Sequence, residues 1–215
     1  MHSMNVYKSQ FKSCINSEIT VYLPSMIQLL KKLNIGCGVD IKQGWINLDF
    51  ATIAGVDVVH DIEKIPLPFG NDEFDEILAQ DVLEHVEYIP VLKDLHRILK
   101  MGGMLTIRVP HFTSKSNFVD PTHKKLFSIN TWDFFARVTP TRTKHIEKEK
   151  TYYFDFSFAT IRKRHITFEK SSRIFFFNRI AESVFNCSPW MQQFYESTFL
   201  SRLFPAENII VELIK

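Results

Sequence analysis

Short apolar stretches, each bounded by turn or polar residues, dominate the first half of the chain. They predict buried strands at residues 32–35, 45–48, 56–60, 74–79 and 104–109. Between the last two, residues 82–100 repeat leucine and isoleucine at helical spacing, and Gly102-Gly103 then supply a stop. Strands that alternate with helices or crossovers favour a parallel sheet with right-handed connections.

The pattern changes after residue 110. Residues 110–151 are polar, basic and loop-like, and we interpret them as an insertion over the strand ends. Within and after this insertion the predicted elements are a helix near 129–137, strands at 152–158 and 164–170, helices at 173–185 and 191–204, and a final strand at 208–214. Residues 1–30 are a lead-in with a helix near 25–32, and its role stays open between a cover for the ligand and packing on the sheet.

These elements predict an α/β fold, a Rossmann-like, doubly wound and mainly parallel sheet of about seven strands whose last strand is antiparallel. We find no internal repeat or linker, so residues 1–215 are treated as one domain. Its parts are a ligand-binding half at 32–110, the substrate-covering insertion at 110–151, and C-terminal strands and helices at 152–215.

The net charge of +2 conceals an asymmetry between the two halves. Residues 1–103 hold 9 Lys and Arg against 14 Asp and Glu, whereas residues 104–170 hold 13 against 6. All seven glycines lie between Gly36 and Gly103, and 16 of the 20 phenylalanines follow residue 103. The first half therefore has the tight turns and acidic residues typical of a nucleotide-binding scaffold. The second half has the aromatic and basic residues of a segment that would cover it.

Composition narrows the protein class further. Hydrophobic residues make up 45% of the chain, and no apolar run approaches the roughly 20 residues of a membrane span. Residues 1–12 lack the apolar core of a signal peptide. Three widely spaced cysteines suggest a reducing, cytoplasmic compartment and offer no zinc spacing, so no metal site is predicted.

Polar residues gather where the predicted strands end. The first strand leads into Gly36 and Gly38, where the backbone can pass close to a ligand, and the second ends on Asp49. Ligands of such sheets bind outside the carboxyl ends of the strands, and an acid after the second strand can accept hydrogen bonds from ribose hydroxyls. The remaining strand-end residues are Asp61, Gln80, Asp81 and His111. Asp81 also suits the N-cap of the helix that follows.

Three segments, residues 33–38 (LNIGCG), 68–86 (PFGNDEFD to DVLEHV) and 95–103 (LHRILKMGG), carry a family resemblance. In that order and spacing, the chain resembles the class I S-adenosylmethionine-dependent methyltransferases over about residues 32–110. Met101 stands where the family has a proline. Asn34 and Asp40 replace an acid and a third glycine that are common there, which weakens the inference for the methionine end of the cofactor.

The resemblance implies a cofactor, S-adenosylmethionine, and a set of residue roles. Gly36 and Gly38 would line its methionine part, and Asp49 would hold its ribose hydroxyls. Toward the adenine, Asp61 would face the amino group, and Ile62 would pack on the ring. The backbone of Gln80 would lie near the methionine amino group, with Asp81 beside it.

Methyl transfer from a sulfonium mainly requires alignment, and a hydroxyl acceptor adds the need for a base. The candidate bases are His85, His111 and His123, because imidazole accepts a proton near neutral pH. His85 also fits a structural role, since Leu-Glu-His-Val is common in the family. The candidate substrate-binding residues are Asp120, Lys124 and Lys125. The two lysines favour an anionic acceptor, such as a phosphorylated or nucleotide-linked sugar or a lipid-linked glycan.

We therefore predict an enzyme that methylates a small-molecule or glycan acceptor, with a hydroxyl as the favoured target. The alternatives are a non-catalytic methyltransferase-like module and a nucleic-acid methyltransferase. A pI near 8.4 and the missing Asn/Asp-Pro-Pro-aromatic motif argue against nucleic acid. A nicotinamide enzyme is disfavoured because Ile41 replaces the last glycine of G-x-G-x-x-G. The Phe-rich tail fits either the core, which we favour, or a homodimer face.

Overall fold

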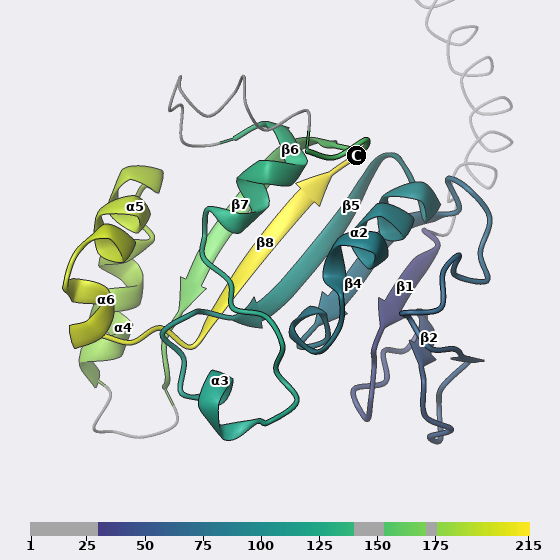
Figure 1. Ribbon diagram of the computed structural model, residues 1–215, viewed down its shortest axis with the longest axis horizontal. Helices are drawn as coiled ribbons and strands as arrows, with labels where there is room; N and C mark the ends of the chain where they lie inside the picture. Colours follow the sequence, from purple (N-terminus) through teal and green to yellow (C-terminus); the bar gives the residue numbers. More distant parts are fainter. Residues whose placement is uncertain (1–29, 140–152, 171–175) are drawn as a thin grey trace, which may run out of the picture. The chain divides into compact units, whose positions relative to one another are not determined.

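The centre of the fold is an eight-stranded sheet with strand order β3-β2-β1-β4-β5-β8-β7-β6 (Figure 1). It is seen in a computed structural model that describes residues 30–139, 153–170 and 176–215. Residues Lys31–Lys215 form one compact unit. The helix expected near residues 25–32 falls almost entirely outside the described residues.

The strands are β1 (Lys32–Ile35), β2 (Ile46–Asp49), β3 (Val58–Val59), β4 (Phe74–Gln80), β5 (Leu99–Pro110), β6 (Ala136–Val138), β7 (Phe158–Thr167) and β8 (Asn208–Ile214). The helices are η1 (Leu83–His85), α2 (Tyr88–Ile98), α3 (Ser116–Val119), η2 (Thr131–Phe135), α4 (Phe176–Phe185), α5 (Pro189–Ser197) and α6 (Leu200–Leu203), of which η1 and η2 are 3₁₀ turns.

Strands β1 to β5 pair in parallel, whereas β8 runs antiparallel to both of its neighbours, β5 and β7. The predicted α/β class, the parallel sheet and the reversed last strand are therefore confirmed. Because β1 lies between β2 and β4, the strand order changes direction at β1. This is the topological switch point, and ligands of such sheets bind at the carboxyl ends of the strands there.

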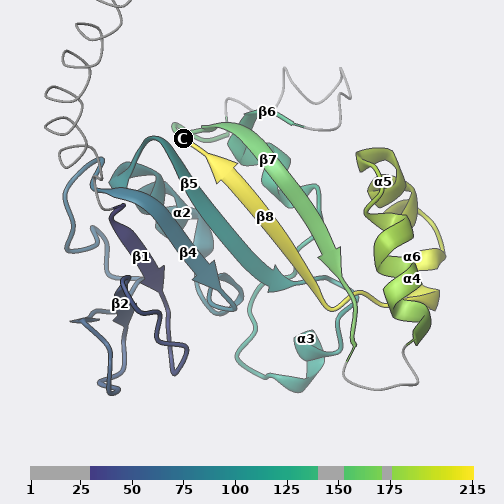
Figure 2. The ribbon, with the colours of Figure 1, turned by 180° about the vertical axis from the view of Figure 1, so that it is seen from behind.

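One face of the sheet is packed and the other is half-exposed. Alternate residues of the central strands, such as Ile77, Ile107 and Val211, are fully buried, and α2 and η2 lie over one face (Figure 1). Seen from behind, the central strands have no described helix over them (Figure 2). Several residues that alternate with the buried ones, among them Glu76, Thr106 and Arg108, are half-buried and polar. This pattern is usual for a sheet with a single packed face.

The prediction of one continuous helix over residues 82–100 is wrong. The chain forms the 3₁₀ turn η1, turns extended at Val86 and restarts as α2 at Tyr88. Pro90 explains the break, because in a continuous helix it would lack an N–H and its ring would clash with the Val86 carbonyl. With the helix starting at Tyr88, Pro90 instead lies in the first turn, where it is tolerated.

The predicted strand at 152–158 is also wrong, since β7 begins only at Phe158. The alternating aromatics Phe154 and Phe156 instead stack on Phe135, with ring centroids 4.7 and 5.9 Å apart. The helix expected at 129–137 is the shorter 3₁₀ turn η2. Alternating apolar residues signal a strand only where a neighbouring strand accepts their backbone hydrogen bonds.

Candidate functional site

The turn after β1 is built on two glycines in the left-handed region. Gly36 has φ +62° and Gly38 has φ +50°. A Cβ at Gly36 would lie 2.4 Å from the Val82 side chain, so this position also needs the close approach that only glycine permits. The turn lies at the carboxyl end of β1, at the switch point of the sheet.

Asp49 ends β2 and faces this turn. The residue is 5% exposed, and its carboxylate accepts hydrogen bonds from the backbone N–H groups of Gly38, at 2.7 Å, and Ala51, at 2.9 Å. Each carboxylate oxygen therefore keeps a further lone pair. Asn34, which stands where the family commonly has an acid, also contacts this turn, because its side-chain amide donates to the Asp40 carbonyl at 2.8 Å.

The other predicted cofactor residues lie at the ends of the neighbouring strands. Asp61 follows β3, and its carboxylate, 43% exposed, accepts from the Glu63 N–H at 3.1 Å. The adjacent Ile62 is buried in the core. Gln80 is the last residue of β4 and pairs in register with Arg108 of β5. The predicted cofactor-binding residues therefore lie at the carboxyl ends of the four parallel strands β1 to β4.

Asp81 is held by an arginine that the sequence analysis missed. It has φ +51°, and its carboxylate takes two hydrogen bonds from the guanidinium of Arg108, one of them 2.9 Å long. These bonds raise the pKa of Arg108. Asp81 does not cap the turn that follows, whose N-cap residue is Val82. The strand register alone could have revealed this pair, because Arg108 lies beside Gln80.

Two of the three candidate histidines meet although they are far apart in sequence. The rings of His85 and His123 pack edge to face with centroids 4.7 Å apart. The Nδ1 of His85 shares a hydrogen bond of 2.8 Å with the hydroxyl of Thr122, which donates to Asp120 at 2.6 Å. The Nε2 of His123 lies 3.7 Å from the same carboxylate. Asp120 therefore orients both rings.

Burial shapes the charge of this histidine cluster. The pKa of His123 is lowered by burial and by the neighbouring His85. Glu84 was passed over in the sequence, yet it is 1% exposed, and burial, reinforced by the negative charge of Asp81, raises its pKa to about 7. The motif Leu-Glu-His-Val held the signal, but only the histidine draws attention as a base.

The predicted substrate lysines are engaged in ion pairs on the surface. Lys124 Nζ lies 3.8 Å from Glu63, and Lys125 Nζ lies 2.9 Å from Glu87. Their backbone N–H groups donate to the Glu84 carbonyl, at 2.8 and 3.2 Å. The lysines therefore border the histidine cluster, with their charges partly neutralised.

The third candidate histidine, His111, lies elsewhere. Its side chain is 0% exposed, and its two ring nitrogens contact Thr113 at 2.7 Å and Glu196 of α5 at 3.0 Å. Glu196 also accepts from Ser128 and from the Ile129 N–H. Both ring nitrogens of His111 therefore have partners inside the protein, whereas His85 and His123 lie together after β4.

The glycine turn, the acid after β2 and the switch point all lie within a stretch of the chain that matches known proteins. Residues 28–107 match a family model described as a methyltransferase domain. Over this stretch the chain is similar to methyltransferase domains, and a solved structure shares its α/β fold. This match agrees with the family, the enzyme class and the cofactor that the sequence predicted.

A sequence relative and two solved structures resemble this chain. A demethylmenaquinone methyltransferase of Staphylococcus epidermidis is 26% identical over 160 residues, which cover 71% of this chain and 61% of the relative. The chain thus spans about three fifths of the length of that relative. A structure of a candidate methyltransferase from Bacillus halodurans superposes with a TM-score of 0.52 at 15% identity, covering 86% of this chain and 92% of the other. An Archaeoglobus fulgidus S-adenosylmethionine-dependent methyltransferase gives 0.49 at 17% identity over 98% of both chains.

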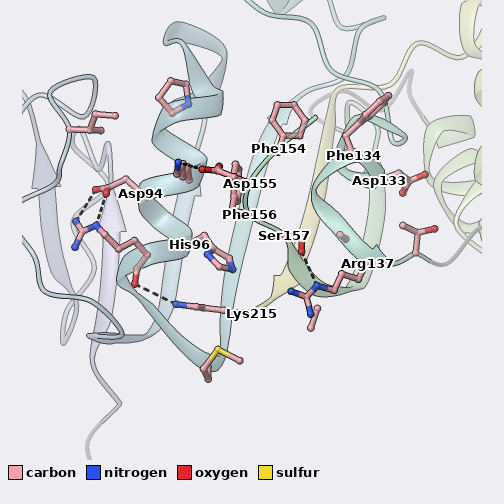
Figure 3. A pocket seen from close by; sticks show the side chains of 18 of the residues that line it. Asp94, His96, Asp133, Phe134, Arg137, Phe154, Asp155, Phe156, Ser157 and Lys215 are labelled. Atoms are coloured by element: carbon pink, nitrogen blue, oxygen red, sulfur yellow. Dashed lines mark hydrogen bonds and ion pairs between the residues drawn. The ribbon is translucent and has the colours of Figure 1, made fainter. Parts of the chain in front are cut away.

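A large cavity of this chain lies away from these strand ends. It has a volume of about 1120 Å³ and lies between α2 and the segments around η2, β6 and the start of β7 (Figure 3). His96, Phe134, Phe156, Arg137 and Lys215 are among its lining residues. Lys215 donates to the Leu99 carbonyl at 2.8 Å, which places it at the amino end of β5. None of the predicted cofactor or catalytic residues lines this cavity.

Among the described residues, the helices are all too short or too polar to cross a membrane.

Proposed function

We propose that this protein transfers the methyl group of S-adenosylmethionine to a hydroxyl of a small-molecule acceptor. The observation that carries the proposal is the paired site at the switch point: a left-handed glycine turn facing Asp49, with a histidine cluster after β4. The methyl carbon moves in line from sulfur to the acceptor oxygen, and the hydroxyl proton leaves to a base.

On the cofactor side, Asp49 is the central contact in this proposal. Its carboxylate is already fixed by the Gly38 and Ala51 N–H groups, so its remaining lone pairs are preorganised to accept from the two ribose hydroxyls. Gly36 and Gly38 let the backbone approach the methionine part. Asp61 takes the adenine amino group and Ile62 supports the ring, as the family resemblance implies.

On the acceptor side, the proposed proton acceptors are His123 and His85, with Asp120 as the residue that positions them. The lowered pKa of His123 favours the neutral imidazole at pH 7, which is the form that can take a proton. Asp120 fixes His85 through Thr122 and faces His123 directly. This arrangement resembles the base–orienter pairs that serve proton transfer in other enzymes.

The acceptor class is the finer part of the proposal. The Staphylococcus relative is by its name a methyltransferase of demethylmenaquinone, which supports a small-molecule acceptor. Lys124 and Lys125 border the cluster and favour an acceptor that carries an anionic group. Because both lysines already face glutamates, the anion would compete with Glu63 and Glu87 rather than meet unpaired charges.

The experiment begins with calorimetric titration of S-adenosylmethionine into the full chain. Asp49→Asn keeps the shape of the side chain and removes its charge, so the affinity should fall roughly 10- to 100-fold if the carboxylate holds the ribose. Asp155→Asn is the matched control, because Asp155 is an exposed aspartate beside the distant cavity. Equal affinities of wild type and Asp49→Asn would remove the proposed ribose contact.

Acceptor activation is tested separately, with S-adenosylmethionine saturating and a panel of hydroxylated acceptors with and without phosphate. His123→Gln should lower kcat and leave the cofactor affinity unchanged. Lys124→Glu should raise KM for phosphorylated acceptors more than for neutral ones. If no acceptor of either class is methylated while the cofactor binds, a binding module replaces the enzyme as the better interpretation.

A further inference from the structure

The histidine cluster contains a second feature that methyl transfer does not require. Glu84, His85 and His123 each offer one ligand atom, and these three atoms lie within 4.8 Å of one another. The first two come from η1 and the third from the segment after α3. The backbone hydrogen bonds from Lys124 and Lys125 to the Glu84 carbonyl tie the two segments together at this point.

Two of these residues bury polar atoms that nothing in the described chain satisfies. Both carboxylate oxygens of Glu84 and the Nδ1 of His123 are inaccessible to solvent and have no hydrogen-bond partner among the described residues. A buried polar group without a partner costs about 1–3 kcal/mol, so native structures rarely keep one without a reason. Three such atoms in one small cluster point to a ligand between them.

The neighbours of the cluster already resemble the outer shell of a metal site. Ligating histidines usually donate their second ring nitrogen to a carboxylate or another fixed acceptor, which holds the ring in place. His85 Nδ1 is engaged with Thr122, which is in turn fixed by Asp120. His123 turns Nε2 toward Asp120, and its Nδ1 is buried with no hydrogen-bond partner among the described residues.

The donor set selects the class of ion. Two imidazoles with one carboxylate suit zinc, cobalt, nickel or ferrous iron, whereas magnesium and calcium prefer oxygen ligands throughout. Around an ion about 2.1 Å from each donor, tetrahedral ligands lie about 3.4 Å apart. The widest pair here must therefore close by about 1–1.5 Å, which a side-chain rotation of the partly exposed Asp120–His123 segment can supply.

We propose that Glu84, His85 and His123 bind one divalent transition-metal ion, with the remaining coordination positions open. Three protein ligands and an open position are typical of catalytic rather than structural ions. The role of the ion rests on the proposed function: with the ion bound, His85 and His123 would hold it instead of taking the proton. The ion would then polarise the acceptor hydroxyl, whose proton would leave to a water molecule. A water molecule enclosed by the same three residues is the competing occupant.

The test uses the full chain, freed of metal with a chelator and carrying no histidine tag. Co²⁺ and Zn²⁺ are titrated by calorimetry, and the visible absorption of Co²⁺ reports its coordination. We expect one equivalent bound, with affinity lowered about tenfold or more in Glu84→Gln and in His123→Gln. His165→Gln is the control, because His165 also faces a carboxylate, Glu182 at 3.3 Å, but belongs to no such cluster.

Thermal unfolding of each metal-free variant shows whether it folds, and Glu84→Gln keeps the size of the buried side chain. Absence of stoichiometric binding by folded wild type would overturn the proposal and leave the water as occupant. Binding that both variants retain would overturn it too. Because these readouts use neither cofactor nor acceptor, a protein that binds metal but not S-adenosylmethionine would refute the proposed function alone.

Discussion

Gly36 offers the sharpest test of how the cofactor turn is built, and Gly38 offers its matched control. Both residues have positive φ, so alanine at either position pays roughly 1–2 kcal/mol for the left-handed conformation. Only at Gly36 does the new methyl group also meet an obstacle, the Val82 side chain at 2.4 Å, whereas nothing lies within 4 Å at Gly38. Overpacking of this kind adds about 1–3 kcal/mol.

We therefore expect Gly38→Ala to lower the free energy of unfolding by about 1–2 kcal/mol and Gly36→Ala by about 2–5 kcal/mol. Urea denaturation of the cofactor-free protein measures both, and the larger loss should shift the midpoint by about 1–2 M. Val82→Ala removes the nearest atom but leaves its Cβ 2.8 Å from the new methyl group. It should thus relieve the Gly36→Ala defect by only about 1 kcal/mol in a double-mutant cycle. Equal losses at the two glycines, or a coupling of zero, would refute the reasoning.

Three further predictions concern buried charges. Arg164→Met should cost about 3–5 kcal/mol of unfolding free energy, because Arg164 and Asp133 form a buried ion pair at 3.1 Å, and adding Asp133→Asn should recover part of that loss in chemical denaturation. Because the pKa of Glu84 is raised, the folded protein keeps a proton that the unfolded chain releases. The free energy of unfolding of the metal-free protein should therefore fall by about 3 kcal/mol as the pH rises from 4.5 to 7. Glu84→Gln should flatten this pH dependence, and an unchanged slope in the variant would contradict the prediction. His111→Asn breaks the buried contact with Glu196 and should cost about 2–3 kcal/mol of stability without changing the affinity for S-adenosylmethionine, whereas a stable variant that fails only in methyl transfer would return His111 to the acceptor site.

The strands of the cofactor half could be predicted because local rules decide them. Apolar runs between glycines and turn residues placed β1 and β4 at the right residues, and the same rule found β8 at Asn208–Ile214. The helix at 82–100 failed because one proline outweighed a good helical repeat. The chain accommodates Pro90 by starting α2 at Tyr88, so that the proline lies in the first turn of the helix.

The candidate site divides along the same line. Asp49 and the glycines follow from strand ends, which the sequence reveals. His85 meets Thr122, 37 positions later in the sequence, and the adjacent His123 only because of the path of the chain between them, and no local pattern encodes that path. The same holds for His111, whose place after β5 suggested the cleft, while its burial against Glu196 is set by the packing of α5. Tertiary contacts of this kind lie beyond what periodicity can predict.

The place of β8 in the sheet has a consequence for how the protein folds. This strand comes after every other described strand in the sequence, yet it lies between β5 and β7 and pairs with both along its length. Met104 meets Ile214, so the pairing closes a loop of more than a hundred residues. Such non-local pairing slows folding and leaves strand edges exposed meanwhile. During synthesis, the edges of β5 and β7 would stay unjoined until residues 208–214 leave the ribosome, which makes this stage the one most open to aggregation or to a chaperone.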